Sequence, residues 1–314
     1  MVMADSGPVM ELADDGLSKL QSVMACLAMA VFYVAILYSP TLILRLPPPS
    51  SFKSFMIRRF VCAFFSSLLS IILCASILPI RSWKMSYLSS VYGIRLDHMW
   101  QAVVYPLSLT SLMYCGSLVL NVLSLRSSNG ISSDGQDHIL SNFSDKILQL
   151  ISNISAWRNY IVAPLTEELV YRACMVPLLL CAGFGTYNVI IFCPIFFSLA
   201  HLNNFVEFYM QHQSLARAFT IAGLQLCYTV VFGSYASFLF IRTGHFIAPL
   251  IAHVFCNIMG LPTLYSRESG GLVTVAFLMG MMGFILLLFP LTYPGMYNNR
   301  TDSCNCWQRY CIWS

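Results

Sequence analysis

Long runs of apolar residues alternate with short polar segments along most of the chain. Eight of these runs approach the roughly 20 residues that a helix needs to cross a bilayer. They cover residues 21–45, 60–80, 101–124, 159–182, 187–203, 217–241, 245–263 and 271–292. Because the apolar residues are continuous and do not alternate with polar ones, they indicate membrane helices and not the strands of a barrel. We therefore predict an all-α fold, a polytopic transmembrane bundle of about eight spanning helices, as a single membrane-embedded domain over 1–314.

Composition narrows the classes of protein further. Hydrophobic residues make up 58% of the chain and charged residues only 10%, whereas a soluble domain carries roughly 25% charged residues. A soluble globular enzyme is excluded, because the chain has too few charged residues to cover the surface of a soluble domain. A disordered chain is excluded, because the apolar content is too high. The net charge of +4 is scattered along the chain, so no dense basic run indicates a nucleic-acid partner.

The polar segments between the apolar runs are predicted to be loops. Residues 46–54 form a Pro/Ser break, and 126–158 form a polar loop. The second part of this loop, from about Ile139 to Trp157, is amphipathic, which predicts a segment that lies on the membrane surface. The loops 46–59, 125–158, 204–216 and 264–270 share one side of the bundle and carry slightly more Lys and Arg than the other side. This asymmetry favours that side as the cytosolic one.

The fourth apolar run contains three charged residues. Glu167 and Glu168 are adjacent, and Arg172 follows Glu168 by four residues, which places it one turn along on the same helix face. Ionisable groups in a bilayer are costly unless they are paired or hydrated, so they usually mark function. We predict a buried ion pair between Glu168 and Arg172, which leaves Glu167 as the spare carboxylate. A purely structural ion pair between helices is the alternative.

Two further runs carry polar residues at the same depth. His201 stands near the end of the fifth run, and His253 and Asn257 are one turn apart in the seventh. If the eight helices alternate in direction, Glu167, His201, His253 and Asn257 all lie within about 15 Å of one membrane face, at 1.5 Å per residue. We predict that they line a polar intramembrane cavity. Interhelical hydrogen bonding is the alternative for His253 and Asn257.

The residue types in this predicted cavity suit hydrolysis of an amide. A carboxylate and an imidazole can hold a water between them and act as general base. A second imidazole and an amide can donate to a developing oxyanion. Pro164 and Pro249 each lie close to this polar site in the sequence, and irregular helix geometry at membrane depth is tolerated where it lines a wet cavity.

Three motifs carry these residues, and as a set they resemble a known family. The motifs are EExxxR, FxxxH and HxxxN, which stand here as Glu167-Glu168 to Arg172, Phe197 to His201, and His253 to Asn257. They are the signature of the CAAX prenyl protease and bacteriocin-processing (CPBP) family of intramembrane proteases. The runs IVAPLTEELVYRACMVP, FGSYASFLFIRTGH and HVFCNIMGLP further resemble its eukaryotic type II CAAX protease branch. The resemblance is strong over about 157–262, which we take as the core that carries the catalytic motifs.

The resemblance implies an activity and a set of roles. Enzymes of this branch are endopeptidases that remove the last three residues, aaX, from CAAX proteins already farnesylated or geranylgeranylated, Ras-like small GTPases among them. By motif position, Glu167 activates water with help from His201, and His253 and Asn257 hold the oxyanion. Glu168 and Arg172 are then supporting residues. The resemblance implies no required cofactor or metal, and a location in the endoplasmic reticulum membrane with a site that is accessible from the cytosol and in contact with lipid.

Other readings of the same residues stay open at this point. Glu167, His201 and His253 could form a three-ligand zinc site. Cys174 lies near the helix face of Glu167 and could be a thiol nucleophile. The Glu and His residues could instead relay protons in an ion-coupled transporter, or line a groove of a non-catalytic scaffold that binds lipidated tails.

Overall fold

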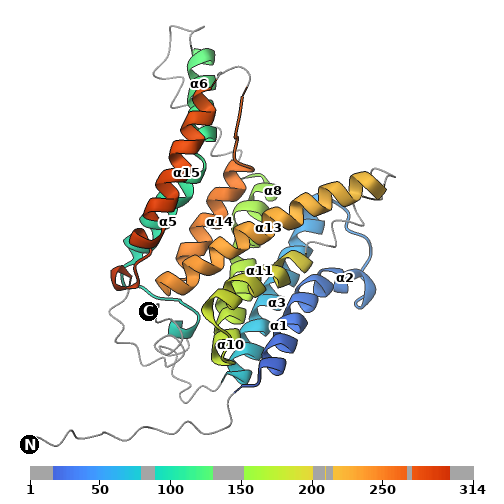
Figure 1. The fold of residues 1–314 in the computed structure, drawn as a ribbon. Coiled ribbons are helices and arrows are strands. Elements are labelled where there is room, and N and C mark those ends of the chain that lie inside the picture. The colour runs from blue at the N-terminus through green and yellow to red at the C-terminus, as the bar shows by residue number, and fades with distance from the viewer. Residues whose placement is uncertain are drawn as a thin grey trace, which may run out of the picture.

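The computed structural model describes residues 17–78, 89–129, 152–200, 209, 215–266 and 271–297, and every regular element longer than one residue in these ranges is helical (Figure 1). The elements in chain order are α1 (Lys19–Ala35), η1 (Ile36–Tyr38), α2 (Ser39–Leu42), α3 (Phe52–Ile77), α5 (Met99–Met113), α6 (Cys115–Asn129), α8 (Ile154–Trp157), η2 (Arg158–Val162), α9 (Ala163–Glu168), η3 (Leu169–Cys174), α10 (Met175–Cys181), α11 (Thr186–Ala200), α13 (Leu215–Thr243), α14 (Ile247–Met259), α15 (Leu272–Leu291) and η4 (Pro294–Met296). The predicted all-α class is therefore confirmed over the described ranges.

Fewer helices meet the requirements for spanning a membrane than the sequence suggested. Within the described ranges, four are long and apolar enough: Lys19–Leu42, Phe52–Ile77, Leu215–Thr243 and Leu272–Leu291. A fifth candidate is the pair α5 and α6, which is bent by 78° at its break. The count is thus four or five, against the eight expected. The difference arises because α11 and α14 are short and the stretch from α8 to α10 is interrupted by irregular turns, although all three overlap predicted runs.

The stretch from Ile154 to Cys181 is helical from end to end, but two π-helical segments interrupt its α-helical pitch. Both η2 and η3 are π-helical, with hydrogen bonds to the fifth residue, and α9 lies between them. π-turns inside α-helices are rare and occur frequently at functional sites. The irregular geometry expected near Pro164 is present, because Pro164 lies in the first turn of α9, directly after η2. The expectation at Pro249 is not met, since Pro249 lies inside the regular first turn of α14.

This irregular stretch forms the centre of the bundle. Its second half is almost wholly buried, including Tyr171, Arg172 and Met175. The surrounding helices are α1 and α3 on one side, α11 and α13 on another, and α14 against η2 and α9. Burial on several sides explains why this run tolerates charged residues, because its polar groups face other helices and not lipid.

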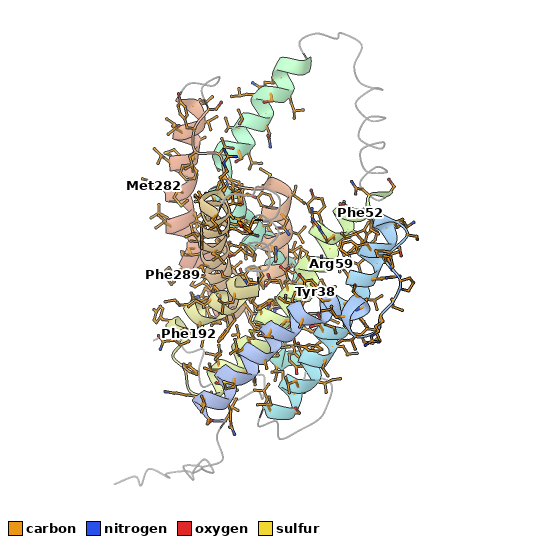
Figure 2. The ribbon with its side chains drawn as sticks, turned by 90° about the vertical axis from the view of Figure 1, so that its right-hand side faces the viewer. Tyr38, Phe52, Arg59, Phe192, Met282 and Phe289 are labelled. Atoms are coloured by element: carbon orange, nitrogen blue, oxygen red, sulfur yellow. The ribbon has the colours of Figure 1, made fainter. Side chains whose placement is uncertain are left out.

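Helices α11, α13 and α15 and the bent pair α5 and α6 form the rest of the described bundle. Helices α11 and α13 pack closely against each other, and α15 packs against α5 and α6 at the far side of the bundle from α1 and α3 (Figure 1). The side chains of Met282 and Phe289 point outward from α15 (Figure 2), and each is more than half exposed. Such an apolar outer face is what a lipid-facing helix presents.

Part of the predicted organisation falls outside the described residues. The loop 126–158 is described only up to residue 129 and from residue 152. Most of its amphipathic segment from Ile139 to Trp157 is therefore outside the described ranges, as is His201.

Candidate active site

The adjacent carboxylates of α9 have different surroundings. Glu168 is fully buried, whereas the side chain of Glu167 keeps 17% of its surface exposed. Neighbouring residues on a helix point about 100° apart, so one carboxylate turns into the bundle while the other turns towards an accessible edge. The sequence assigned Glu168 to an ion pair and left Glu167 spare, and this division is what the structure contains.

Glu168 is paired with Arg172 one turn later. The distance from Arg172 Nη1 to Glu168 Oε1 is 3.0 Å, and both side chains are buried. The guanidinium also lies over two aromatic rings, at 4.8 Å from the centroid of Phe197 and 5.9 Å from that of Phe232. Cation–π contacts of this kind are strongest where water is excluded. The predicted ion pair is thus confirmed, and the aromatic rings add a second stabilising contact that the sequence did not reveal.

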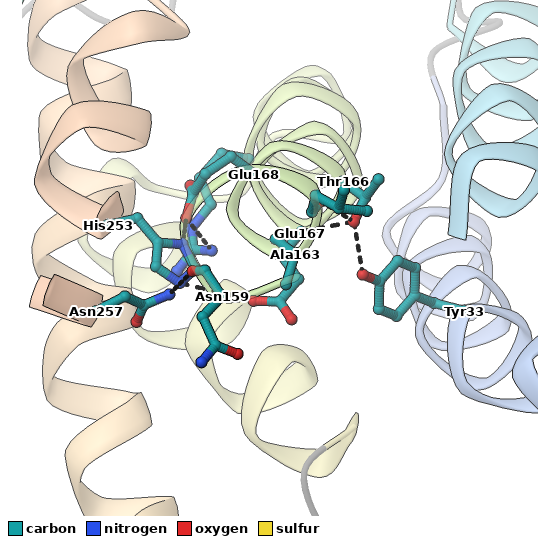
Figure 3. Close-up of polar contacts among 10 residues, drawn as sticks. Tyr33, Asn159, Ala163, Thr166, Glu167, Glu168, His253 and Asn257 are labelled. Carbon is teal, nitrogen blue, oxygen red and sulfur yellow. Dashed lines mark hydrogen bonds and ion pairs between the residues drawn. The ribbon is translucent and has the colours of Figure 1, made fainter. Parts of the chain in front are cut away.

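His253 reaches both carboxylates from α14. Its Nδ1 atom lies 2.7 Å from Glu168 Oε1, and its Nε2 atom lies 3.7 Å from Glu167 Oε2 (Figure 3). An ionised carboxylate accepts but does not donate, so the short contact places a proton on Nδ1 and fixes the ring orientation. The ring of Phe232 packs against the imidazole at 4.9 Å. The 3.7 Å between Nε2 and Glu167 Oε2 is too long for a direct hydrogen bond.

Asn257 lies one helical turn beyond His253 and contacts the same irregular stretch. Its Nδ2 atom donates a hydrogen bond of 2.8 Å to the backbone carbonyl of Asn159 (Figure 3). The residue is exposed, whereas His253 is buried. The predicted shared face of His253 and Asn257 is confirmed, since both side chains reach the stretch that holds the two glutamates.

A tyrosine from the first helix also joins this region. The hydroxyls of Tyr33 and Thr166 are 2.8 Å apart, and Thr166 Oγ1 lies 2.8 Å from the carbonyl of Val162. Because Thr166 has one hydroxyl proton, donation to Val162 leaves its oxygen to accept from Tyr33. Sequence reasoning missed this contact. A tyrosine in an apolar run carries no signal that its hydroxyl meets a partner 133 positions away.

The described part of the chain bears on the alternative readings. Cys174 is fully buried, and the thiols of Cys74 and Cys26 lie near it. No group of three or more His, Cys, Asp or Glu side chains in the described ranges is placed to hold a metal ion. His201 lies outside these ranges. It is the third ligand of the hypothetical zinc site and the second histidine of the predicted cavity. The structure therefore brings together Glu167, Glu168, Arg172, His253 and Asn257.

This arrangement has a definite chemical capacity. The partly exposed carboxylate of Glu167 lies beside the imidazole of His253. Nδ1 of this ring contacts the buried carboxylate of Glu168, and Nε2 faces Glu167. At a separation of 3.7 Å, the two polar atoms can both contact one water that lies beside the pair. A carboxylate next to a bound water is the arrangement required for general-base hydrolysis.

Comparison with known proteins identifies relatives over nearly the whole chain. A family model described as type II CAAX prenyl endopeptidase Rce1-like matches residues 150–259, which include both glutamates, Arg172, His253 and Asn257. A protein of Arabidopsis thaliana named CAAX prenyl protease 2 is 57% identical over 96% of this chain and 100% of its own length. The human protein of the same name is 34% identical over 90% of this chain and 85% of its own length. No solved structure matches the chain.

Proposed function

The chain belongs to the type II CAAX prenyl endopeptidase family, and from this premise we propose that it removes the aaX tripeptide from prenylated CAAX proteins with the site around Glu167. It is a peptidase of CAAX processing, embedded in a membrane. The observation that carries the assignment of the site is the pairing of Glu167 Oε2 with His253 Nε2 across 3.7 Å, while Glu168 holds the opposite nitrogen.

In the proposed reaction Glu167 is the general base. It takes a proton from a water held beside it, and the water oxygen bonds to the carbonyl carbon between the prenylated cysteine and the first aliphatic residue. The partial exposure of Glu167 supports this role, because a base must be reachable by water and substrate. His201 is assigned by its motif position as the residue that helps to hold this water.

His253 and Asn257 are assigned to the oxyanion. As the carbonyl oxygen gains charge, Nε2 of His253 and the amide of Asn257 would donate hydrogen bonds to it. For Nε2 to donate while Nδ1 donates to Glu168, the imidazole must carry both protons, and the neighbouring carboxylates balance its charge. When the tetrahedral intermediate collapses, the C–N bond breaks and the proton on Glu167 passes to the leaving amine.

Glu168 and Arg172 are supporting residues in this scheme. Glu168 orients the imidazole through Nδ1, and Arg172 neutralises the carboxylate in the dry interior. A carboxylate that holds an imidazole in one orientation keeps its reactive nitrogen aimed at the substrate. No step in this scheme is assigned to a metal or cofactor.

The substrates we propose are farnesylated or geranylgeranylated CAAX proteins, Ras-like small GTPases among them. An isoprenoid in contact with the helices and lipid adds about 0.8 kcal/mol per buried CH₂, which would favour prenylated peptide over bare peptide. We also propose that α11, α14 and the stretch from α8 to α10 lie at membrane depth beside the long helices, around a polar cavity. Their packing among the candidate spans supports this arrangement.

Cleavage of a farnesylated CAAX peptide by the purified protein tests the proposal. We expect release of the aaX tripeptide, with slower release from the peptide that lacks the isoprenoid. The variants Glu167→Ala, His201→Asn and His253→Asn should each abolish release. The matched control is His98→Asn, a histidine in a loop before α5 with backbone φ of 51°, a conformation that asparagine tolerates. Near-normal release in the Glu167 variant would reject its role as base.

We further propose that the protein resides in the endoplasmic reticulum with this site open to the cytosol, where prenylation takes place. The loop charges support this orientation. The chain carries glycosylation sequons at Asn142, Asn153 and Asn299. With a neutral linker inserted before Asn299 to extend it from the membrane, glycosylation should occur at Asn299 alone. Glycosylation at Asn142 or Asn153 would reverse the proposed orientation.

A further inference from the structure

One hydrogen bond joins α14 to the beginning of the stretch that holds the two glutamates. It runs from Asn257 Nδ2 to the backbone oxygen of Asn159, over 2.8 Å. Asn159 lies in η2, and α14 packs directly against η2 and α9. A carbonyl inside a helix normally accepts from an N–H of its own chain further along. The availability of this carbonyl to another helix therefore has a local cause.

Pro164 supplies that cause. In η2 the N–H of Ala163 donates to the carbonyl of Arg158, five residues earlier. In the same register the carbonyl of Asn159 would accept from residue 164. That residue is proline, which has no N–H. The register thus leaves the Asn159 carbonyl without its backbone donor, and the side-chain amide of Asn257 takes that place.

This contact also determines how the amide of Asn257 is oriented. A terminal amide has two broad orientations that exchange its oxygen and nitrogen. A carbonyl only accepts hydrogen bonds, so the nitrogen end of the amide must face Asn159. One of the two N–H groups is used there, and the second remains. Asn257 is exposed and lies one turn from His253 on the same helix face, so its amide lies on the side of the helix that holds the site.

We propose that Pro164 and Asn159 are positioning residues for the oxyanion site. Because Pro164 has no backbone N–H, the Asn159 carbonyl is available to accept from Asn257. This hydrogen bond orients the amide so that its second N–H can donate to the substrate. The proposal rests on the proposed function, in which Asn257 donates to the oxyanion. It adds that the orientation of this donor is set from outside α14, by a break in the neighbouring helix.

A double-mutant cycle on tripeptide release tests the proposal. Pro164→Ala restores an N–H that competes for the Asn159 carbonyl. This variant should lower kcat roughly tenfold or more and leave KM nearly unchanged. The substrate still binds, but the oxyanion lacks the hydrogen bond from Asn257. Asn257→Ala should lower kcat about 100-fold. The double variant should be no slower than Asn257→Ala alone. The control Pro290→Ala, a proline inside α15, should behave as the unmodified protein.

The possible outcomes separate the two proposals. If Asn257→Ala keeps its full kcat, the oxyanion role fails and the positioning role fails with it. If kcat falls in that variant but the effects of Pro164→Ala and Asn257→Ala multiply, the oxyanion role stands and the positioning role is overturned. Full activity in Pro164→Ala overturns the positioning role as well.

A second measurement covers the case in which Pro164→Ala does not fold. Asn257→Ala retains the proline, and its loss of the side-chain contact should speed hydrogen–deuterium exchange of the backbone amides over 158–168 in detergent. The exchange in α15 should not change. Exchange over 158–168 that equals that of the unmodified protein would show that the amide does not hold this segment, and would overturn the proposal.

Discussion

The Nδ1 atom of His253 lies 2.7 Å from Oε1 of Glu168, although 85 positions separate the two residues in the sequence. The same carboxylate oxygen accepts from Arg172 at 3.0 Å. One buried oxygen therefore joins the end of the ion pair on one helix to the imidazole of another. This sharing makes Glu168 the residue through which stability and orientation of the site are coupled.

Replacing Glu168 should affect folding and catalysis together. In Glu168→Ala the guanidinium of Arg172 stays buried with no carboxylate beside it, at a cost of about 3–5 kcal/mol in unfolding free energy. The imidazole of His253 also loses its orienting partner, and kcat should fall by about 10²- to 10⁴-fold. Thermal unfolding in detergent and tripeptide release measure the two effects.

A compensated variant separates those two effects. Glu168→Gln/Arg172→Met removes both charges and leaves no unpaired ion, so it should recover most of the lost stability. Its activity should stay low, because His253 still lacks a carboxylate at Nδ1. Recovery of activity along with stability would contradict the orienting role of Glu168.

Tyr33 and Thr166 should behave as one coupled unit. The hydroxyl of Tyr33 donates to Thr166 beside Glu167, so Tyr33→Phe should lower the unfolding free energy by about 0.5–1.5 kcal/mol. Thr166→Val removes the same bond, and the double variant should lose less than the sum of the two single losses. Tyr265→Phe is the control, since Tyr265 is 63% exposed. Strict additivity would mean that the two hydroxyls do not interact.

Replacing each of two glycines in α13 with alanine should change the free energy of unfolding in opposite directions. A Cβ at Gly233 would lie 2.9 Å from Pro194 Cβ and 3.2 Å from Arg172 Nη2. The close approach of α13 to α11 and to the guanidinium therefore needs a residue without a side chain, and Gly233→Ala should cost about 1–3 kcal/mol. At Gly223 nothing lies within 4 Å, so alanine there should add up to about 1 kcal/mol through helix propensity. Equal midpoints of unfolding for both variants would contradict the packing described for α13.

Tyr114 should stabilise the end of α14. It stands at the break between α5 and α6, and its hydroxyl donates to the carbonyl of Gly260, directly after α14, over 2.7 Å. Tyr114→Phe keeps the ring contact with Phe255 but loses this bond, so we expect a loss of about 0.5–1.5 kcal/mol in a chemical unfolding experiment. Tyr228→Phe should cost less, because its hydroxyl is 3.5 Å from that of Tyr114, at the limit of a hydrogen bond. A larger loss for Tyr228→Phe would contradict this assignment.

Local spacing explains why part of the site was predictable. Residues four apart on a helix face one another, so the pair Glu168–Arg172 and the common face of His253 and Asn257 could be read from the chain. The cost of charge in a bilayer explains why these residues belong to an interior site. The family resemblance drew on the same residues and is supported by relatives over nearly the whole chain.

The number of spans was not predictable in the same way. Apolar runs of similar length can become a long lipid-facing helix, a bent pair such as α5 and α6, or a short helix inside the bundle such as α14. Hydropathy measures only the preference of side chains for an apolar environment. It does not distinguish lipid from the interior of a protein, since both are apolar.

The sequence by itself determined that this protein is helical, that it belongs in a membrane and that Glu167 is the carboxylate left over after Glu168 pairs with Arg172, because these properties follow from composition and from spacing along one helix. Only the tertiary structure decided that Glu168 also holds His253, that Tyr33 reaches Thr166 and that Asn257 donates to the carbonyl of Asn159. Each of these contacts joins helices far apart in the chain. Their geometry depends on how whole helices pack, which no local pattern of residues specifies.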